Sequence, residues 1–310
     1  MAGRLLSIGE CMVEVMQAGG GLMRKSFAGD TFNTAYYGRL FLPSDWEVDY
    51  FTAVGDDSIS DEMLAFMRER GVGTDLIRRV EGRSPGLYMI DLKDGERSFT
   101  YWRSVSAAKL LADDPARLRE ALEASRMIVF SGITLAILSP DGVETLLSEL
   151  RRAKAAGKLV AFDPNIRPRL WPDRERMRQV ISDGARAATL VMPSFEDEVV
   201  HFGDGSVAET IARYAGLSVR DILVKDGANG ATLSFDGKLS HVPATRVETI
   251  VDTTSAGDSF NGGFLARYAV DGDADASAAF AARLAAAVIQ HHGALVAKEL
   301  LPELELPQRP

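Results

Sequence analysis

The chain has 310 residues, of which 46% are hydrophobic and 25% charged, and 35 Lys and Arg against 44 Asp and Glu residues give a net charge of −9. Such a composition supports a substantial core and excludes disorder as the main state. The acidic balance argues against nucleic acid or a membrane surface as a partner, because both require clustered positive charge. The single cysteine, Cys11, excludes an internal disulfide and is typical of a protein in the reducing cytoplasm.

Neither a targeting signal nor a membrane span is expected. Glu10 and Glu14 interrupt the apolar pattern of the first 16 residues. The apolar stretch at 127–138 is too short to cross a bilayer and contains Ser131 and Gly132.

Short apolar runs alternate with helix-length segments from the start of the chain. The runs predict strands at 4–9, 48–54, 127–131, 159–163, 189–192 and 222–225. The longer segments predict helices at 31–42, 60–70, 140–156, 174–187, 207–214, 259–270 and about 276–290, with Gly71 and Gly157 as helix ends. This order favours a single α/β domain that spans residues 1–310, with a parallel-rich central sheet and helices on both faces.

Residues 85–103 break this rhythm. Two β-like runs, 86–92 and 97–103, flank Asp94-Gly95, which is a strong two-residue hairpin signal. That turn places Tyr88 opposite Tyr101 and Gly86 opposite Arg103, so the two phenols and the guanidinium share one face. Such a face can bind a polyhydroxylated anion; an ordinary hairpin with aromatic cross-strand packing is the alternative.

The segment 252–263 carries the most chemical information. Ser255, Ala256 and Gly257 precede a helical pattern that starts near Asp258. Unpaired amides at a helix start bind phosphate or a developing oxyanion, and a carboxylate beside them can accept a proton from an attacking hydroxyl. The alternative is that Asp258 only caps its helix.

The same segment, Asp252-Thr-Thr-Ser-Ala-Gly-Asp258 followed by Gly262-Gly263, resembles the C-terminal signature of the ribokinase/PfkB family of carbohydrate kinases. Blocks at 29–35, 54–57, 163–167 and 225–230 are similar to other family motifs in the same order, although Ser60 stands where the family usually has glycine. The resemblance implies a ribokinase-like fold and ATP-dependent phosphorylation of a sugar hydroxyl.

The resemblance also implies roles for individual residues. Asp258 is the implied general base, and the amides of Ala256, Gly257 and Asp258 form the implied anion hole. We expect the helix N-terminus to keep Asp258 ionised at rest. The implied sugar-binding residues are Gly29, Asp30 and Asn33. The implied nucleotide and phosphate contacts are Asn165, Ser194, Lys225, Gly227, Ala228, Gly230 and Ser255, although a glycine-containing loop before a strand is also an ordinary turn.

Two aspartates, Asp197 and Asp252, are candidate ligands for metal ions. The family's Asn-x-x-Glu motif, tied to Mg²⁺, corresponds here to Ser194 and Asp197, so both positions are changed. Asp197 still offers a carboxylate to a metal-bound water. Asp252 is a candidate for holding a monovalent cation such as K⁺, with a structural hydrogen-bonding role as the open alternative.

The loop at 163–171 resembles that of family members acting on fructose or on 2-keto-3-deoxygluconate, and the segment 101–108 with Tyr88 is more similar to the latter. Arg103 and Arg167 can pair with a substrate carboxylate, while Tyr88 and Tyr101 contact hydroxyl or keto oxygens. The implied reaction makes the 6-phosphate from 2-keto-3-deoxygluconate, ATP and Mg²⁺. A neutral-sugar kinase such as fructokinase, or a non-catalytic sugar-binding protein, stays open.

A lid is expected from strands in 11–28 and 85–103. It would exclude water from the reaction, and its exposed sheet would pair copies of the chain into a homodimer or higher homo-oligomer.

Overall fold

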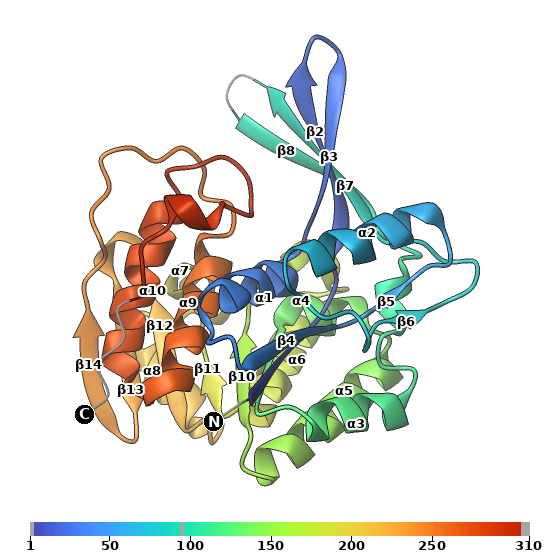
Figure 1. The fold of residues 1–310 in the computed structure, drawn as a ribbon. Coiled ribbons are helices and arrows are strands. Elements are labelled where there is room, and N and C mark those ends of the chain that lie inside the picture. Colours follow the sequence, from blue (N-terminus) through green and yellow to red (C-terminus); the bar gives the residue numbers. More distant parts are fainter. Residues whose placement is uncertain (1–2, 94–95, 305–310) are drawn as a thin grey trace.

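The central element of the fold is an eight-stranded sheet (Figure 1). The structure is a computed structural model that describes residues 3–93 and 96–304. Six neighbouring strands are parallel, and two antiparallel strands follow at one edge. In spatial order they are β4 (Trp46–Phe51), β1 (Gly3–Ile8), β9 (Met127–Ser131), β10 (Leu159–Asp163), β11 (Leu190–Val191), β12 (Asp221–Lys225), β13 (Ala231–Phe235) and β14 (Lys238–Val242). The predicted parallel-rich sheet is confirmed.

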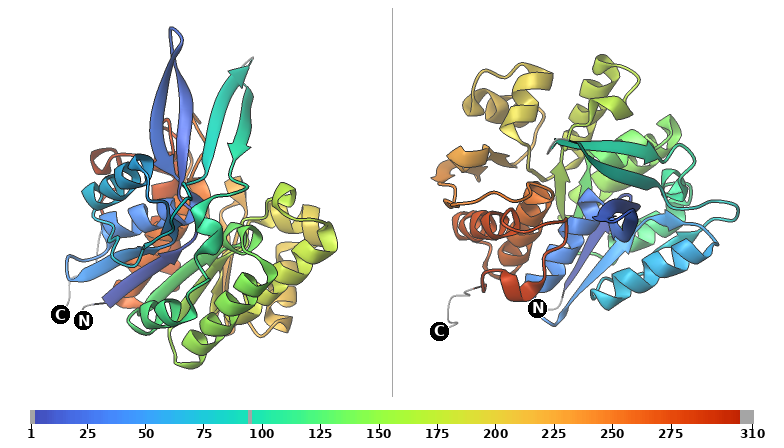
Figure 2. Two further views of the ribbon diagram at one scale, coloured as in Figure 1. Left: turned by 90° about the vertical axis from the view of Figure 1, so that its right-hand side faces the viewer. Right: turned by 90° about the horizontal axis from the view of Figure 1, so that it is seen from above.

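Helices cover both faces of this sheet and bury a hydrophobic cluster under each face (Figures 1 and 2). One face carries α1 (Asp30–Phe41), α2 (Ser58–Glu69), α9 (Ala256–Asp271) and α10 (Ala274–Val288). The other carries α3 (Pro115–Glu123), α4 (Gly132–Ile137), α5 (Pro140–Ala155), α6 (Arg174–Ala187) and α8 (Val207–Gly216). The short α7 (Phe195–Phe202) follows β11. Neighbouring strand residues such as Leu5 and Leu6 enter opposite clusters, as strand alternation requires.

Several helix ends follow from local chemistry. The Asp57 side chain accepts a hydrogen bond from the Ser60 amide and caps α2. Gly71 and Gly157 follow α2 and α5 with φ of 72° and 80°, as the helix-end prediction requires. Ser60 uses its hydroxyl to accept a bond of 2.8 Å from the Gly55 amide, so the serine ties the helix start to the preceding loop.

One predicted strand is divided. The run at 48–54 belongs to β4 and to the separate β5 (Ala53–Val54), which pairs with β6 (Arg78–Arg79) in a two-stranded sheet. Thr52 stands between the two strands, and it is there that the chain leaves the central sheet.

A four-stranded sheet projects from the body of the molecule (Figure 2). Its order is β3 (Leu22–Ala28), β2 (Met12–Gly19), β7 (Leu87–Lys93) and β8 (Glu96–Trp102), with β2 and β7 parallel. The predicted register is confirmed, because Tyr88 pairs with Tyr101 and Ile90 with Phe99. The Asp94-Gly95 turn itself lies outside the described residues.

Candidate active site

Several predicted site residues, together with Asp163, lie where the parallel strands end and where α1 and α9 begin. Asp163 closes β10, Lys225 closes β12, and Asp30 and Asp258 lie in the first turns of the two helices. The carboxyl ends of parallel strands are the usual place for ligands in α/β sheets. The two helices pack backbone to backbone, because a Cβ at Gly262 of α9 would lie 2.7 Å from the Thr34 carbonyl oxygen of α1.

Asp258 is a half-buried carboxylate at the start of α9. Its Oδ2 accepts a 2.8 Å hydrogen bond from Asn33 Nδ2, which joins the implied base to the implied sugar-binding stretch. Loss of water around the carboxyl raises the pKa of Asp258 to about 7, the Asp30 and Asp163 carboxylates act in the same direction, and Asn33 and Lys225 oppose them. With this pKa the carboxyl is only partly ionised near neutral pH, whereas the sequence led us to expect an ionised carboxylate at rest. Desolvation outweighs the helix N-terminus, so the group is poised to exchange a proton near neutral pH.

The backbone at the start of α9 provides two of the three predicted amides. Ser255 adopts a left-handed conformation with φ of 65°, and the helix begins at Ala256. The Ala256 amide donates to the Thr253 carbonyl oxygen at 3.2 Å. It therefore closes the turn and is not one of the amides available to an anion. No hydrogen bond among the described residues uses the amide of Gly257 or Asp258. These two N–H groups lie at the positive end of the helix dipole, which suits an anion.

The sugar-side carboxylate Asp30 is held by Asn165. Asn165 Nδ2 donates to Asp30 Oδ2 at 2.9 Å, and its amide donates to Asp163 Oδ1 at 3.0 Å. Desolvation raises the pKa of Asp30, and hydrogen bonds from neighbouring side chains partly oppose this. Gly29 precedes Asp30 at a position where a Cβ would collide with the Glu10 carbonyl oxygen, so glycine is needed for close approach.

Lys225 lies beside the start of α9, among side chains rather than in an open loop. Its Nζ donates to Asp163 Oδ2 at 2.9 Å and to Asn261 Oδ1 at 3.1 Å. Asn261 Nδ2 donates in turn to Asp163 Oδ2 at 2.6 Å. The sequence reasoning did not assign roles to Asp163 or Asn261. The three-residue step from Asp258 to Asn261, one face of a helix, is the signal that could have found Asn261.

The loop that follows Lys225 is tightly folded. Gly227 and Gly230 have φ of 50° and 97°, and Ala228 lies between them in the 3₁₀ turn Gly227–Asn229. A Cβ at Gly230 would collide with the Val242 carbonyl oxygen, so this glycine is required by the approach of β14. Ser194 precedes α7 and forms an isolated β-bridge with Lys225, which brings the two predicted nucleotide segments together.

The shared face of the projecting sheet contains two buried acid partners that the sequence reasoning missed. The Tyr88 hydroxyl donates to Glu14, and the ring centroids of Tyr88 and Tyr101 lie 5.9 Å apart. The Arg103 guanidinium forms an ion pair with the buried Glu10. Arg103 is thus already charge-compensated at the base of the sheet.

Glu10 connects several parts of this base. Its second oxygen accepts a hydrogen bond from the Ser106 hydroxyl, and it lies close to Gly86, which directly precedes β7. A buried acid with these partners links the projecting sheet to the core. No sequence spacing points to it, because its partners are more than 70 residues away.

Arg167 and Asp197 lie near each other after β10 and at the start of α7. Desolvation raises the pKa of Asp197, and the Arg167 guanidinium partly opposes this. Arg167 is exposed and donates a hydrogen bond to the Ile166 carbonyl oxygen, so the structure does not join it to Arg103. Within residues 3–93 and 96–304 no three His, Cys, Asp or Glu side chains form a metal cluster.

A single carboxylate such as Asp197 is nevertheless compatible with Mg²⁺. This ion usually keeps several waters and takes one or two protein carboxylates together with substrate phosphates. Asp252 has a different environment. Its two carboxylate oxygens accept bonds of 2.9 Å from the amides of Thr254 and Gly293, so it fastens the loop before α9 to the segment after α10.

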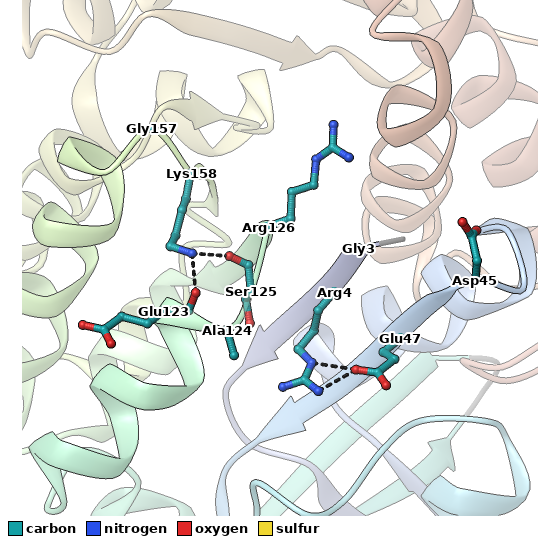
Figure 3. A pocket seen from close by; sticks show the side chains of 10 residues that line it. All are labelled: Gly3, Arg4, Asp45, Glu47, Glu123, Ala124, Ser125, Arg126, Gly157 and Lys158. Atoms are coloured by element: carbon teal, nitrogen blue, oxygen red, sulfur yellow. Dashed lines mark hydrogen bonds and ion pairs between the residues drawn. The ribbon is translucent and has the colours of Figure 1, made fainter. Parts of the chain in front are cut away.

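A separate cavity of about 610 Å³ opens at the opposite end of the sheet, where β1, β4, β9 and β10 begin (Figure 3). There Arg4 pairs with Glu47, and Lys158 donates to the carbonyl oxygens of Glu123 and Ser125. These charges are satisfied within the protein. The cavity lies away from the clustered carboxylates and is not part of their site.

The fold and this site define a sugar-phosphorylating enzyme class. Residues 3–299 match the model of the pfkB family carbohydrate kinases, and the chain belongs to this family. Its relatives include the 2-dehydro-3-deoxygluconokinase of Dickeya dadantii strain 3937, at 41% identity over 95% of this chain and 97% of that protein. The enzyme of the same name from Escherichia coli K12 is 40% identical, over 97% of this chain and 100% of that protein.

A solved structure, the ATP-bound fructokinase of Xylella fastidiosa, superposes with a TM-score of 0.82 at 25% identity, covering 97% of this chain and 96% of the other. The sugar-acid kinases are thus considerably more similar in sequence than this fructokinase. No helix among the described residues is long and apolar enough to cross a membrane.

Proposed function

We propose that the chain is an ATP-dependent kinase that phosphorylates 2-keto-3-deoxygluconate on its 6-hydroxyl. The observation that carries the proposal is Asp258, which lies beside two unpaired helix amides and is bonded to Asn33 of the sugar-binding stretch. The names of the relatives at 40% and 41% identity support the same substrate.

In this proposal Asp258 accepts the proton of the 6-hydroxyl as its oxygen attacks the γ-phosphorus of ATP. The new O–P bond forms while the bond to the leaving ADP oxygen breaks. Transfer of this kind depends mainly on positioning and on stabilising charge, and the Gly257 and Asp258 amides are placed to bind a phosphoryl oxygen. With a pKa of about 7, Asp258 can take up a proton during the reaction and release it afterwards.

The proposed substrate contacts come from both sides of the site. The core contributes Gly29, Asp30, Asn33 and Arg167, and the projecting sheet contributes Tyr88, Tyr101 and Arg103. A substrate carboxylate needs a cation that is not already neutralised. Arg167 is the better candidate for this contact because Arg103 is paired with Glu10.

The proposed nucleotide contacts lie along the neighbouring loops. They are Asn165, Ser194, Gly227, Ala228, Gly230 and Ser255. Asp197 would hold Mg²⁺ through a bound water, and the ion would supply charge neutralisation at the phosphates. For Asp252 the two bonds from backbone amides support the structural role over a K⁺ site.

The projecting sheet is proposed to act as a lid that excludes water, and to pair copies of the chain. It exposes five large apolar side chains, namely Leu22, Met23, Phe99, Tyr101 and Trp102. Such surface is normally covered by a partner. A cytoplasmic location completes the proposal, since ATP and a reducing environment for Cys11 are both found there.

The test is a comparison of initial rates with ATP on 2-keto-3-deoxygluconate and on fructose, followed by ADP release. We expect the sugar acid to give the higher kcat/KM. A higher value on fructose would favour the neutral-sugar alternative. Absence of ADP release on every sugar and sugar acid tested would favour a non-catalytic binding protein.

A further inference from the structure

Lys225 occupies a position that its sequence motif does not explain. The side chain extends from the end of β12 toward the start of α9 and is 14% exposed. Its Nζ contacts Asp163 and Asn261 at 2.9 and 3.1 Å, and it lies 3.6 Å from where a Cβ on Gly257 would stand. The ammonium therefore lies beside one of the two unpaired amides.

The surroundings of this ammonium are strongly acidic. The charged groups that face Asp258 are Asp30 from α1, Asp163 from the end of β10, and Lys225 from β12. Among the described residues around Asp258, three carboxylates thus share one cation. Lys225 forms an ion pair with Asp163 and lowers the pKa of Asp258, against the desolvation and the two other carboxylates that raise it.

Resting on the proposed function, we propose that Lys225 is a positioning residue for phosphoryl transfer. Its ammonium, anchored by Asp163 and Asn261 next to the Gly257 amide, balances the clustered carboxylates so that Asp258 stays available as the base. The role assigned to this residue thereby changes from nucleotide contact to control of the proton acceptor.

Two features of the geometry support this assignment. Asn261 contacts both Lys225 and Asp163 and lies one turn after Asp258 on α9, so the ammonium is fixed relative to the base. Asp163 also accepts from the Asn165 amide, and Asn165 holds Asp30. Lys225 is consequently connected to all three acids, either through space or through intermediate side chains.

Removing the positive charge should make proton loss from Asp258 harder, because repulsion from Asp30 and Asp163 would no longer be opposed. The acidic limb of the pH profile of kcat should therefore move to higher pH. A shift of about one pH unit, with kcat at pH 7 reduced about fivefold, is the expected size for the loss of one nearby charge. A residue that only binds nucleotide would raise the KM for ATP and leave the limb in place.

The experiment measures kcat against pH, at saturating ATP and sugar acid, for the full chain and for Lys225→Met, Lys225→Gln and Lys225→Arg. Lys225→Gln retains a donor for Asp163 and serves if the methionine variant does not fold. Lys225→Arg should restore most of the original limb. Lys238→Met, an exposed lysine of β14, is the matched control and should leave the profile unchanged.

An unmoved acidic limb in both Lys225→Met and Lys225→Gln, with a raised KM for ATP, would overturn the inference. A wild-type chain that phosphorylates no sugar acid would instead overturn the proposed function. The two failures are therefore distinguishable in one data set.

Discussion

Replacing Asp258 with asparagine should lower the activity of the enzyme and yet make the folded protein more stable above neutral pH. The substituted amide would keep the shape of the side chain and an oxygen that can accept from Asn33, but it cannot accept the hydroxyl proton. General-base catalysis typically contributes about 10²–10⁴-fold, so we expect kcat to fall by that factor while ATP still binds.

The same substitution should stabilise the folded protein above neutral pH. The pKa of Asp258 is raised from 3.8 to about 7, chiefly by desolvation. At 1.36 kcal/mol per pKa unit this corresponds to about 4 kcal/mol as an upper value. A raised carboxyl pKa means that stability is full below the unfolded value near pH 4 and is lost as pH rises toward 7. Asparagine does not titrate, so the variant does not lose this stability as the pH rises.

The assay is urea unfolding of both proteins at pH 4.5 and pH 8, with ATP binding and turnover measured on the same samples. We expect Asp258→Asn to be about 1–3 kcal/mol more stable than the wild type at pH 8 and to differ little at pH 4.5. The gain at pH 8 stays below the upper value because the extra amide hydrogens of asparagine need hydrogen-bond partners. A kcat within tenfold of the wild type, or a variant that is less stable at pH 8, would refute the reasoning.

Other predictions concern pH, the lid and the loops. The wild-type kcat/KM should fall about tenfold between pH 8 and pH 6 as Asp258 is protonated, which a rate profile checks. Arg103→Ala should cost about 3–5 kcal/mol of stability because it leaves Glu10 buried without its cation, whereas the double change Glu10→Gln with Arg103→Met should recover much of this in denaturant unfolding. Gly230→Ala should lower the melting temperature, because φ of 97° and the adjacent carbonyl oxygen both exclude a Cβ, while the exposed Gly237→Ala tests the positive φ alone.

Much of the architecture could be predicted because its signals are local. The alternation of apolar runs and helical segments defines the parallel sheet, and Asp94-Gly95 correctly set the register between Tyr88 and Tyr101. The same dipeptide occurs at Asp236-Gly237, with φ of 47° and 74°, between β13 and β14. That hairpin was therefore predictable from the sequence, although it was not among the predicted elements.

The electrostatics of the site could not be predicted in the same way. The dipole of α9 is visible in the sequence, but the extent to which Asp258 loses contact with water depends on packing among segments over 200 residues apart. The pairing of Arg103 with Glu10 likewise joins separate elements. The ionisation of a buried side chain depends on its charged partners. Partners that are distant in the chain form no residue spacing by which the sequence could reveal them.

The close contact between α1 and α9 at Gly262 has a consequence for altering the enzyme's preference. Asn33 and Asp258 belong to two helices that touch through their backbones, so the alignment of the acceptor with its base cannot be adjusted without disturbing the core. The projecting sheet instead carries exposed aromatic side chains, such as Phe99 and Trp102, that belong to neither core cluster. Attempts to admit a longer or bulkier acceptor should therefore vary that sheet and keep the helix pair unchanged.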